Sequence, residues 1–332
     1  MTAETKINPE SSPKTATTGE FVFPKYKHPC GISVRTVLDS VAHTGKRVTT
    51  LELKYPRFIH SEFLTHRDRA RNSASSRAIP AKKMRREIIR NPVIPVKFGA
   101  AQKRMVDGEE VKQAWLARRV WLTARLVALF ASWMLSKLGV HKNLCNRLTE
   151  PWMFITVICT ATEWKNFLRL RNHPDAENHI QILAALIDEA LHDSEPILRD
   201  YHQWHMPYVN DMDRARLRRI VGKPQTKTER VEGYLQDYVD QSERTDTEII
   251  DEAMRRVSVA RCARVSFLTH HGTRSVLDDL DLFGRLTRGS GFGHWSPMEH
   301  VATPANWGNQ TSGPFHGWIQ YRKQFQLENE PG

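Results

Sequence analysis

Residues 49–55, TTLELKY, alternate between polar and apolar side chains, and this alternation predicts a β-strand. Pro56 follows and favours the start of a short helix that runs through residue 66. Apolar residues recur at helical spacing from Gly108 to Leu138, which predicts a long buried helix. The same spacing over residues 175–193 predicts a second helix, whose apolar face comprises Ile180, Leu183, Ala184, Ile187, Ala190 and Leu191.

Three further segments have mixed patterns. Residues 150–171 are mostly apolar up to Glu163 and basic beyond it, which predicts an apolar helix with a basic end. Residues 259–268, VARCARVSFL, are typical of a strand that follows a helix. Residues 293–307, GHWSPMEHVATPANW, are rich in turn-forming residues. Helical and strand patterns therefore mix along the chain, and we expect an α/β fold.

The apolar residues also suggest how the chain divides. Residues 1–30 are polar and predict a disordered tail, and residues 326–332 form a second, short tail. Residues 31–325 are expected to form one α/β domain, because no internal repeat is present and the length allows a full core. Within this domain, the high charge of residues 211–247 predicts a solvated insertion rather than a nucleic-acid-binding arm.

Composition is typical of a globular, water-soluble protein, since 40% of the residues are hydrophobic and 26% are charged. No apolar run reaches the roughly 18 residues of a membrane span, because Arg125 interrupts the nearest one. The polar N-terminal region has no signal-peptide pattern. The four cysteines lie far apart without a C-x-x-C pair, which indicates a reduced, cytoplasmic protein without structural zinc.

The formal net charge of +12 indicates an anionic partner, either nucleic acid or a phosphorylated small molecule. The basic residues recur in several separate segments instead of one block. This dispersal favours several anion contacts spread over one fold. A basic nucleic-acid-binding protein is the alternative from another functional class, although no recognition motif for nucleic acid is present.

The segment 60–80, HSEFLTHRDRARNSASSRAIP, carries histidines, arginines and serines around few apolar residues. Guanidinium groups bind phosphate through paired hydrogen bonds, and small hydroxyl groups complete such a site. An exposed crossover from helix to loop explains the same composition without a ligand. The candidate residues are His66, Arg67, Asn72, Ser75 and Arg77.

Two short motifs carry further candidates. In NFLRLR, which begins at Asn166, Arg169 and Arg171 cannot share a helix face. One of them is therefore expected to point into a site and the other into solvent, and the alternative is a basic last turn that favours the helix dipole. In ARVSF, Arg264 and Ser266 flank strand-like residues and would be unremarkable alone.

The motif HWSPMEH contains two histidines and one glutamate, which are residue types that bind metals. Its spacing differs from H-E-x-x-H and a proline interrupts it, so no metal site is expected. The candidate residues are His294, Ser296, Glu299 and His300.

Taken together, the four motifs resemble the flavin-dependent thymidylate synthases, the thymidylate-synthase-complementing family. That family's signature is Arg-His-Arg, seven residues, Ser and, one residue later, Arg. The chain has Thr65-His66-Arg67, seven residues, Ser75 and then Arg77. ARVSF, GHWSPMEH and NFLRLR each resemble another landmark, so the resemblance covers most of residues 49–305. In the common form ARVSF and GHWSPMEH come first, so the chain resembles a circularly permuted member.

The resemblance implies a twisted central sheet flanked by helices and a homotetramer with active sites between subunits. It implies FAD as the cofactor, NADPH as its reductant and 5,10-methylenetetrahydrofolate as the carbon donor. The reaction would transfer a one-carbon unit to C5 of a pyrimidine nucleotide, with dUMP as the first expectation. This chemistry needs no cysteine nucleophile, so Cys30, in HPCG, is expected to be a spare thiol. Neither a membrane nor nucleic acid is an expected partner.

The resemblance also implies roles for single residues. Ser75 and Arg77 match positions that hold the nucleotide phosphate. His294 matches a histidine beside the flavin ring and the folate. Arg171 matches the arginine that contacts the pyrimidine, where a fixed cation stabilises negative charge developing on the ring carbonyls. The flavin-contacting positions are matched by His66, Arg67, Asn72, Asn166, Ser266, Ser296 and Glu299.

Several positions depart from the family pattern, and most of them face the nucleotide. Thr65 replaces an arginine, Ser73 a glutamate and Ala78 a tyrosine. Asn146 stands where an arginine usually contacts the nucleotide, and Asp175 where a histidine is common. The nucleotide is therefore left open, and methylation or hydroxymethylation of dCMP or UMP is the alternative to methylation of dUMP.

Overall fold

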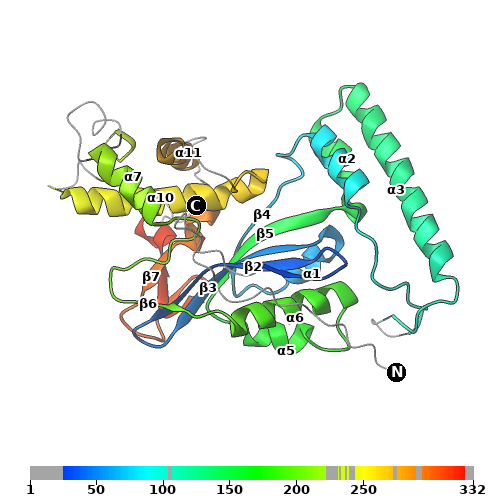
Figure 1. Ribbon diagram of the computed structural model, residues 1–332, viewed down its shortest axis with the longest axis horizontal. Helices are drawn as coiled ribbons and strands as arrows, with labels where there is room; N and C mark the ends of the chain where they lie inside the picture. Colours follow the sequence, from blue (N-terminus) through cyan, green and yellow to red (C-terminus); the bar gives the residue numbers. More distant parts are fainter. Residues whose placement is uncertain are drawn as a thin grey trace.

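The computed structural model describes residues 25–103, 107–221, 231, 233–235, 238, 244–271, 275–288 and 294–325. At its centre is a mainly antiparallel sheet with the strand order β1-β2-β3-β5-β4, and β6 pairs in parallel with β2 (Figure 1). The expected mixture of helices with a central sheet is confirmed. The strands are β1 (Lys25–Lys27), β2 (Ser33–Ala42), β3 (Arg47–Pro56), β4 (Ala70–Ser73), β5 (Phe154–Ala161) and β6 (Ile197–Arg199).

The strand predicted from the alternation at residues 49–55 is confirmed as part of β3, which pairs with β2 and β5. The helix predicted for residues 150–171 is wrong over its first half, because residues 154–161 form β5 between β3 and β4. β5 is rich in β-branched residues and is buried along most of its length. A continuous apolar run of this length fits a buried strand as well as a buried helix.

Two helices cover one face of the sheet, α5 (Lys165–Arg171) and α6 (Asn178–His192) (Figure 1). The predicted apolar face of α6 is confirmed, since five of its six members are buried and Leu191 is partly buried. The short helix expected after Pro56 is present as η1 (Arg57–Ile59) and α1 (His60–Leu64). These elements and the inward-facing residues of β3 and β5 form the largest apolar core.

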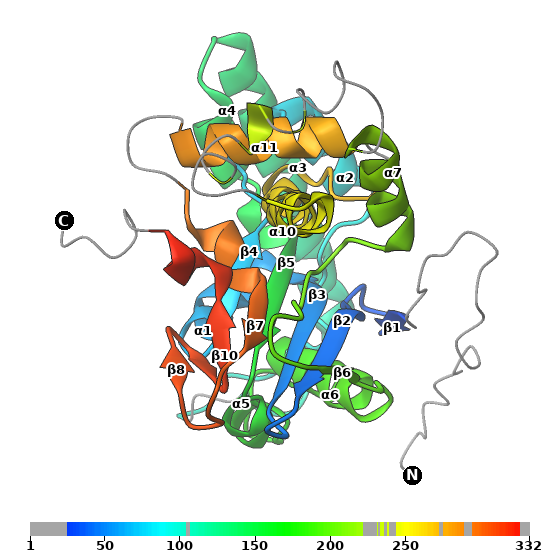
Figure 2. The same ribbon diagram turned by 90° about the vertical axis from the view of Figure 1, so that its left-hand side faces the viewer.

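The other face of the sheet lies below α10 (Asp246–Arg264), which runs between the sheet and α7 (Asp211–Val221) and α11 (Val276–Arg288) (Figure 2). The predicted strand at residues 259–268 is therefore wrong. Most of that segment is the end of α10, and the rest contains η3 (Val265–Phe267). Residues 259–263 are all buried, because neighbours surround the helix end and remove the polar stripe that usually marks a helix.

The charged segment 211–247 is not simply a solvated insertion in the part that the structure describes. Leu217 and Val221 of α7, with Val231 and Leu235, are buried against α10 and form a second apolar core. The prediction of a solvated segment rested on its high overall charge, which does not show that some of its apolar positions are buried.

The long apolar helix is present as α3 (Ala114–Lys137), which starts later than predicted. It forms an arm beside the sheet with α2 (Ala81–Arg90) and α4 (Lys142–Arg147) (Figures 1 and 2). Its predicted burial is wrong for the isolated chain, since only Leu129 and Ser132 of this helix are buried. Large apolar side chains are exposed along it, including Trp115, Val120, Val127 and Phe130, the last with 62% of its surface accessible.

The turn-rich segment and the end of the chain form short elements. They are η4 (Ser296–His300), η5 (Tyr321–Gln324), the pair β7 (Ala302–Pro304) and β10 (Trp318–Gln320), and the pair β8 (Thr311–Ser312) and β9 (Phe315–His316). A short turn, η2 (Glu150–Trp152), leads into β5. Within the expected tail 1–30, residues 25–27 form β1, while residues 1–24 and 326–332 lie outside the described residues. Among the described helices, none has the length and hydrophobicity to cross a bilayer.

Candidate functional site

The segment singled out for its arginines and serines runs along the edge of the central sheet. It contains α1, a turn and β4, which pairs only with β5 among the described strands. Asn72 lies on β4 opposite Ile158 of β5, and its side chain is largely buried. Polar residues suit an edge strand, because only one side of the strand continues the sheet.

β4 brings three of the four sequence motifs together. Both η3, from ARVSF, and η4, from HWSPMEH, pack against β4 and β5. The backbone amide of Ser75 donates a hydrogen bond of 2.9 Å to the carbonyl oxygen of Ser266. Residues that lie far apart in the sequence therefore meet beside the edge of the sheet.

A buried chain of hydrogen bonds attaches η4 to the sheet. His300 Nδ1 lies 2.8 Å from Thr160 Oγ1, and that hydroxyl is 2.7 Å from Thr50 Oγ1. Thr50 continues the chain to His205 Nε2 at 2.7 Å, and His205 Nδ1 is 2.9 Å from Ser40 Oγ. Burial lowers the pKa of His300 to about 3, so this imidazole is neutral at ordinary pH. Two members of η4, Ser296 and Glu299, are thereby held beside β4.

The fourth motif reaches the same region through Arg171 at the end of α5. Arg171 Nε donates a hydrogen bond of 3.1 Å to His66 Nε2, and its Nη1 lies 3.7 Å from Glu62 Oε2. Burial, together with the charges of Arg69 and Arg171, lowers the pKa of His66. His66 Nε2 accepts from a guanidinium, so the imidazole is neutral and carries its proton on Nδ1.

The neighbouring arginine behaves differently, as the helical spacing predicted. Arg169 is exposed, whereas Arg171 is partly buried against His66. Glu62 beside Arg171 is also perturbed. Its burial and the charge of Glu177 raise its pKa, and Arg171 acts against this rise.

Other predicted residues point toward solvent or brace the loops of the site. The Oγ of Ser75 accepts a hydrogen bond of 3.2 Å from the amide of Arg77. Glu299 forms an ion pair with Arg322, and its carbonyl oxygen accepts a bond of 3.2 Å from Gln320 Nε2. The exposed members of the predicted set are Arg67, Arg77, Asn166, His294 and Ser296.

Two further residues support this region. The sequence assigned no role to Arg69, and it placed Asn146 at a position that contacts the nucleotide in the family. Arg69 is 2% exposed, donates to Asp68, and lies over the rings of Trp164 and Phe167 at 4.8 and 4.7 Å. Asn146 is fully buried, and its Nδ2 donates to the carbonyl oxygens of Ser76 and Ile79 at 2.7 and 3.0 Å. Asn146 therefore braces the loop that follows β4. An alternating RDRAR sequence could have drawn attention to Arg69, but its aromatic neighbours come from a distant segment.

The predicted spare thiol, Cys30, is partly buried with its Sγ 3.0 Å from His28 Nδ1. Burial raises the pKa of Cys30, which disfavours the thiolate that a nucleophile needs.

A cavity of about 390 Å³ lies between α3, α6 and the loop that carries Pro95 and Lys97. Glu177 and His179 line it, and their side chains approach to 2.5 Å between Oε1 and Nδ1. The cavity contains none of the predicted site residues. Glu177 also contributes to the raised pKa of Glu62, which lies beside Arg171.

Comparison with known proteins gives limited similarity. No family model matches the chain, and no curated protein matches it. A crystal structure of thymidylate synthase X from Helicobacter pylori with FAD and dUMP has a TM-score of 0.31 and 17% identity. That match covers 43% of this chain and 67% of the other. A second structure of the flavin-dependent enzyme from the same organism, complexed with FAD and dUMP, has a TM-score of 0.30 with the same identity and coverage. Similarity at this level adds no weight to a function.

Proposed function

We propose that this protein is a flavin-dependent enzyme that transfers a one-carbon unit from 5,10-methylenetetrahydrofolate to C5 of a pyrimidine nucleotide, with dUMP as the first candidate. The observation that carries the proposal is the meeting of four sequence motifs around β4 and His66. Each motif also resembles a landmark of the flavin-dependent thymidylate synthases in residue type and spacing. A chance resemblance would not require the four segments to be neighbours in space.

The residues around β4 suit a ligand that carries phosphates. Arg67 and Arg77 are exposed, and neither forms an ion pair within the described part of the chain. Free guanidinium groups can each give two hydrogen bonds to a phosphate. We assign Arg67, His66, Asn72, Asn166, Ser266, Ser296 and Glu299 to FAD, and Ser75 and Arg77 to the nucleotide phosphate. When bound, FAD supplies the hydride that reduces the transferred carbon, and NADPH restores the reduced flavin.

Arg171 is the residue we assign to the pyrimidine. Its Nε is held by His66, so the guanidinium has a fixed plane. Its terminal nitrogens can then stabilise negative charge that develops on a ring carbonyl as C5 becomes nucleophilic. His66 contributes direction without a second positive charge, because its pKa is lowered. His294, exposed at the start of η4, is assigned to the flavin ring and the folate.

Self-association as a homotetramer is part of the proposal, and α3 supports it. A 24-residue helix with five large apolar side chains more than half exposed leaves a surface that is unusual for a monomer. Covering this surface with a second copy would bury those side chains. The circular permutation of the motifs also belongs to the proposal.

Two departures from the family pattern bear on which nucleotide is preferred. Asn146 is occupied in bracing residues 76–79, so it is not free to replace a nucleotide-binding arginine. Ser73 is half-buried on β4 and carries no charge. These differences keep dCMP and UMP as alternatives, with a methyl or a hydroxymethyl product.

The experiment is reconstitution of the purified full chain with FAD, followed by assays with dUMP, dCMP and UMP in parallel. We expect a yellow protein with one FAD per chain, and a C5-alkylated product that depends on both methylenetetrahydrofolate and NADPH. A colourless protein that takes up no FAD would refute the proposal. If it also bound DNA with a steep dependence on salt, the basic nucleic-acid-binding alternative would be favoured.

A further inference from the structure

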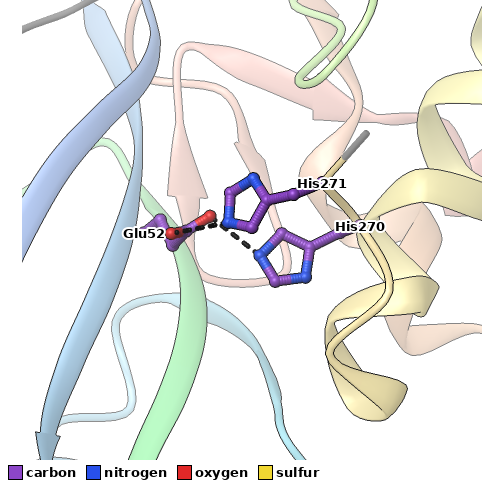
Figure 3. A group of neighbouring side chains, drawn as sticks. All are labelled: Glu52, His270 and His271. Atoms are coloured by element: carbon purple, nitrogen blue, oxygen red, sulfur yellow. Dashed lines mark hydrogen bonds and ion pairs between the residues drawn. The ribbon is translucent and has the colours of Figure 1, made fainter. Parts of the chain in front are cut away.

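Outside the region around β4, a buried glutamate is contacted by two consecutive histidines. Glu52 lies on β3, and His270 and His271 lie in the turn that follows η3 (Figure 3). His270 Nε2 is 2.9 Å from Glu52 Oε2, and His271 Nε2 is 3.3 Å from Glu52 Oε1. The three potential ligand atoms lie within 4.8 Å of one another. Both imidazoles therefore direct the same nitrogen toward one carboxylate.

The local backbone explains how two adjacent histidines reach the same group. Leu268 has a positive φ of 53°, which ends η3 and turns the chain back toward the sheet. The rings of His270 and His271 then lie side by side, with centroids 4.0 Å apart and planes inclined at 44°. In an extended strand, neighbouring side chains would point to opposite sides.

The carboxylate is held in place by groups other than the histidines. Arg35 Nη2 and the Tyr208 hydroxyl donate to Glu52 Oε2 at 2.7 and 3.0 Å. Burial alone would raise the pKa of Glu52, but the bonds from His270 and His271 and the charge of Arg35 hold it well below its usual value. Glu52 is therefore an ionised, oriented acceptor, and Oε1 is the oxygen that carries fewer bonds.

We propose that Glu52, His270 and His271 form a binding site for a zinc ion. Two imidazole nitrogens and one carboxylate oxygen are the donor set of many three-ligand zinc sites, in which water occupies the fourth position. The hydrogen bonds from Arg35 and Tyr208 correspond to the outer contacts that orient a metal-bound carboxylate. His271 has 59% of its side chain exposed, which provides a path for the ion.

The surroundings of these three residues limit the affinity of the site for zinc, and its donor types decide which metals it binds. The guanidinium of Arg35 offsets the charge of Glu52, and His270 Nδ1 is buried without a hydrogen-bond partner among the described residues. Lost outer contacts lower metal affinity about 10–100-fold, so the site should be weaker than a complete structural zinc site. Magnesium and calcium need several oxygen ligands and should not bind.

The location gives the zinc ion a structural consequence. Arg35, Glu52, Ile158 and Asn72 are consecutive cross-strand partners on β2, β3, β5 and β4. The two histidines thus contact the sheet at Glu52, in the row of cross-strand partners that ends at Asn72. In the sequence they follow Ser266 by a few residues. A bound zinc ion would fasten the turn after η3 to the sheet.

The test is zinc titration of the chelator-treated full chain by calorimetry, without flavin or nucleotide, with cobalt substitution to report the coordination by visible absorption. We expect one zinc ion per chain, no response to magnesium, and at least tenfold weaker zinc binding in His271→Ala and in Glu52→Gln. His271 is largely exposed, so its variant should fold even if the buried Glu52→Gln variant does not.

His173→Ala is the matched control, because His173 is an exposed histidine 3.8 Å from the carboxylate of Asp175. It should bind zinc as the parent does. The proposal is overturned if the parent binds no zinc, or if His271→Ala binds zinc as tightly as His173→Ala. Because flavin takes no part in the titration, this result is independent of the proposed enzymatic function.

Discussion

The acid sensitivity of the fold should depend strongly on His300. Its pKa falls from 6.5 to about 3, because burial disfavours the charged imidazolium. The unfolded chain binds a proton near pH 6.5 and the folded chain does not, so the free energy of unfolding decreases as the pH falls below 6.5. One pKa unit corresponds to about 1.4 kcal/mol, which gives a loss of roughly 3–5 kcal/mol by the time the folded-state pKa is reached.

That loss is a large part of the 5–15 kcal/mol by which domains are usually stable. We expect His300→Asn to remove it, because asparagine can still bond to Thr160 Oγ1 but does not titrate. The variant should be less stable than the parent near neutral pH, where it loses packing. The difference should shrink by about 2 kcal/mol between roughly pH 6.5 and pH 5. Urea unfolding followed by circular dichroism at several pH values measures this difference.

His205 lies in the same hydrogen-bonded chain, and its pKa is also lowered by burial and by nearby charges. The parent should therefore lose more stability in acid than the titration of His300 alone explains. The His300→Asn variant should still show the part of this loss that comes from His205. His173→Asn, at an exposed position, provides the control and should follow the parent at every pH. If the His300→Asn and parent curves run parallel from neutral pH to about pH 4, His300 is not held neutral and the reasoning fails.

Three further predictions concern the proposed chemistry. Arg171→Lys should bind FAD but lose most of its turnover, because lysine lacks the fixed pair of donors. Arg169→Lys, the control, should turn over at the rate of the parent. Equal rates for the two variants would mean that the wrong arginine was assigned to the pyrimidine. Ser75→Ala and Arg77→Ala should each weaken nucleotide binding about 10–100-fold, measured by calorimetry, since a hydrogen bond to a charged group contributes roughly 1.5–3 kcal/mol. Cys30→Ser should retain nearly full activity, because its thiol has a raised pKa; a hundredfold loss in a folded variant would indicate a covalent mechanism.

Local periodicity predicted the elements that have one apolar and one polar side. The alternation in TTLELKY identified β3, and the spacing of apolar residues identified the buried face of α6. The opposite orientations of Arg169 and Arg171 followed from helical geometry alone. In α5 and α6 the pattern exists because solvent lies on one side of the helix, whereas most polar residues of β3 are buried, and Thr50 is hydrogen-bonded to Thr160.

Two segments with neighbours on all sides were predicted as the wrong type of element. β5 is buried on both faces and has no alternation, so its apolar run was taken for a helix. The end of α10 is packed between the sheet and two helices, and its arginines are paired there instead of facing water. Arg261, for example, bonds to Asp213 and Asp279. The reverse holds for α3. Its apolar pattern predicted a buried helix, but only Leu129 and Ser132 of this helix are buried in the single chain.

The candidate site was predicted only as a set of motifs. The residue types in the four segments suggested which side chains matter, but their convergence depends on the pairing of β4 with β5. The supporting contacts were outside the reach of sequence patterns. Asn146 braces a loop that lies 67 to 70 positions away in the chain, and Glu52 meets His270 across 218 positions.

The position of β5 in the chain sets the order in which the protein can assemble during synthesis. β5 is the only described partner of β4 and the second partner of β3, yet it follows β4 by roughly 80 residues. At translation rates of about 5–20 residues per second, β4 would wait on the order of 4–16 s for β5, and the free edge of β3 would wait longer. η4, near the end of the chain, arrives later still. The edges of β3 and β4 are therefore unpaired while this stretch is synthesised, and a chain released before η4 would lack the segment that packs against β4 and β5.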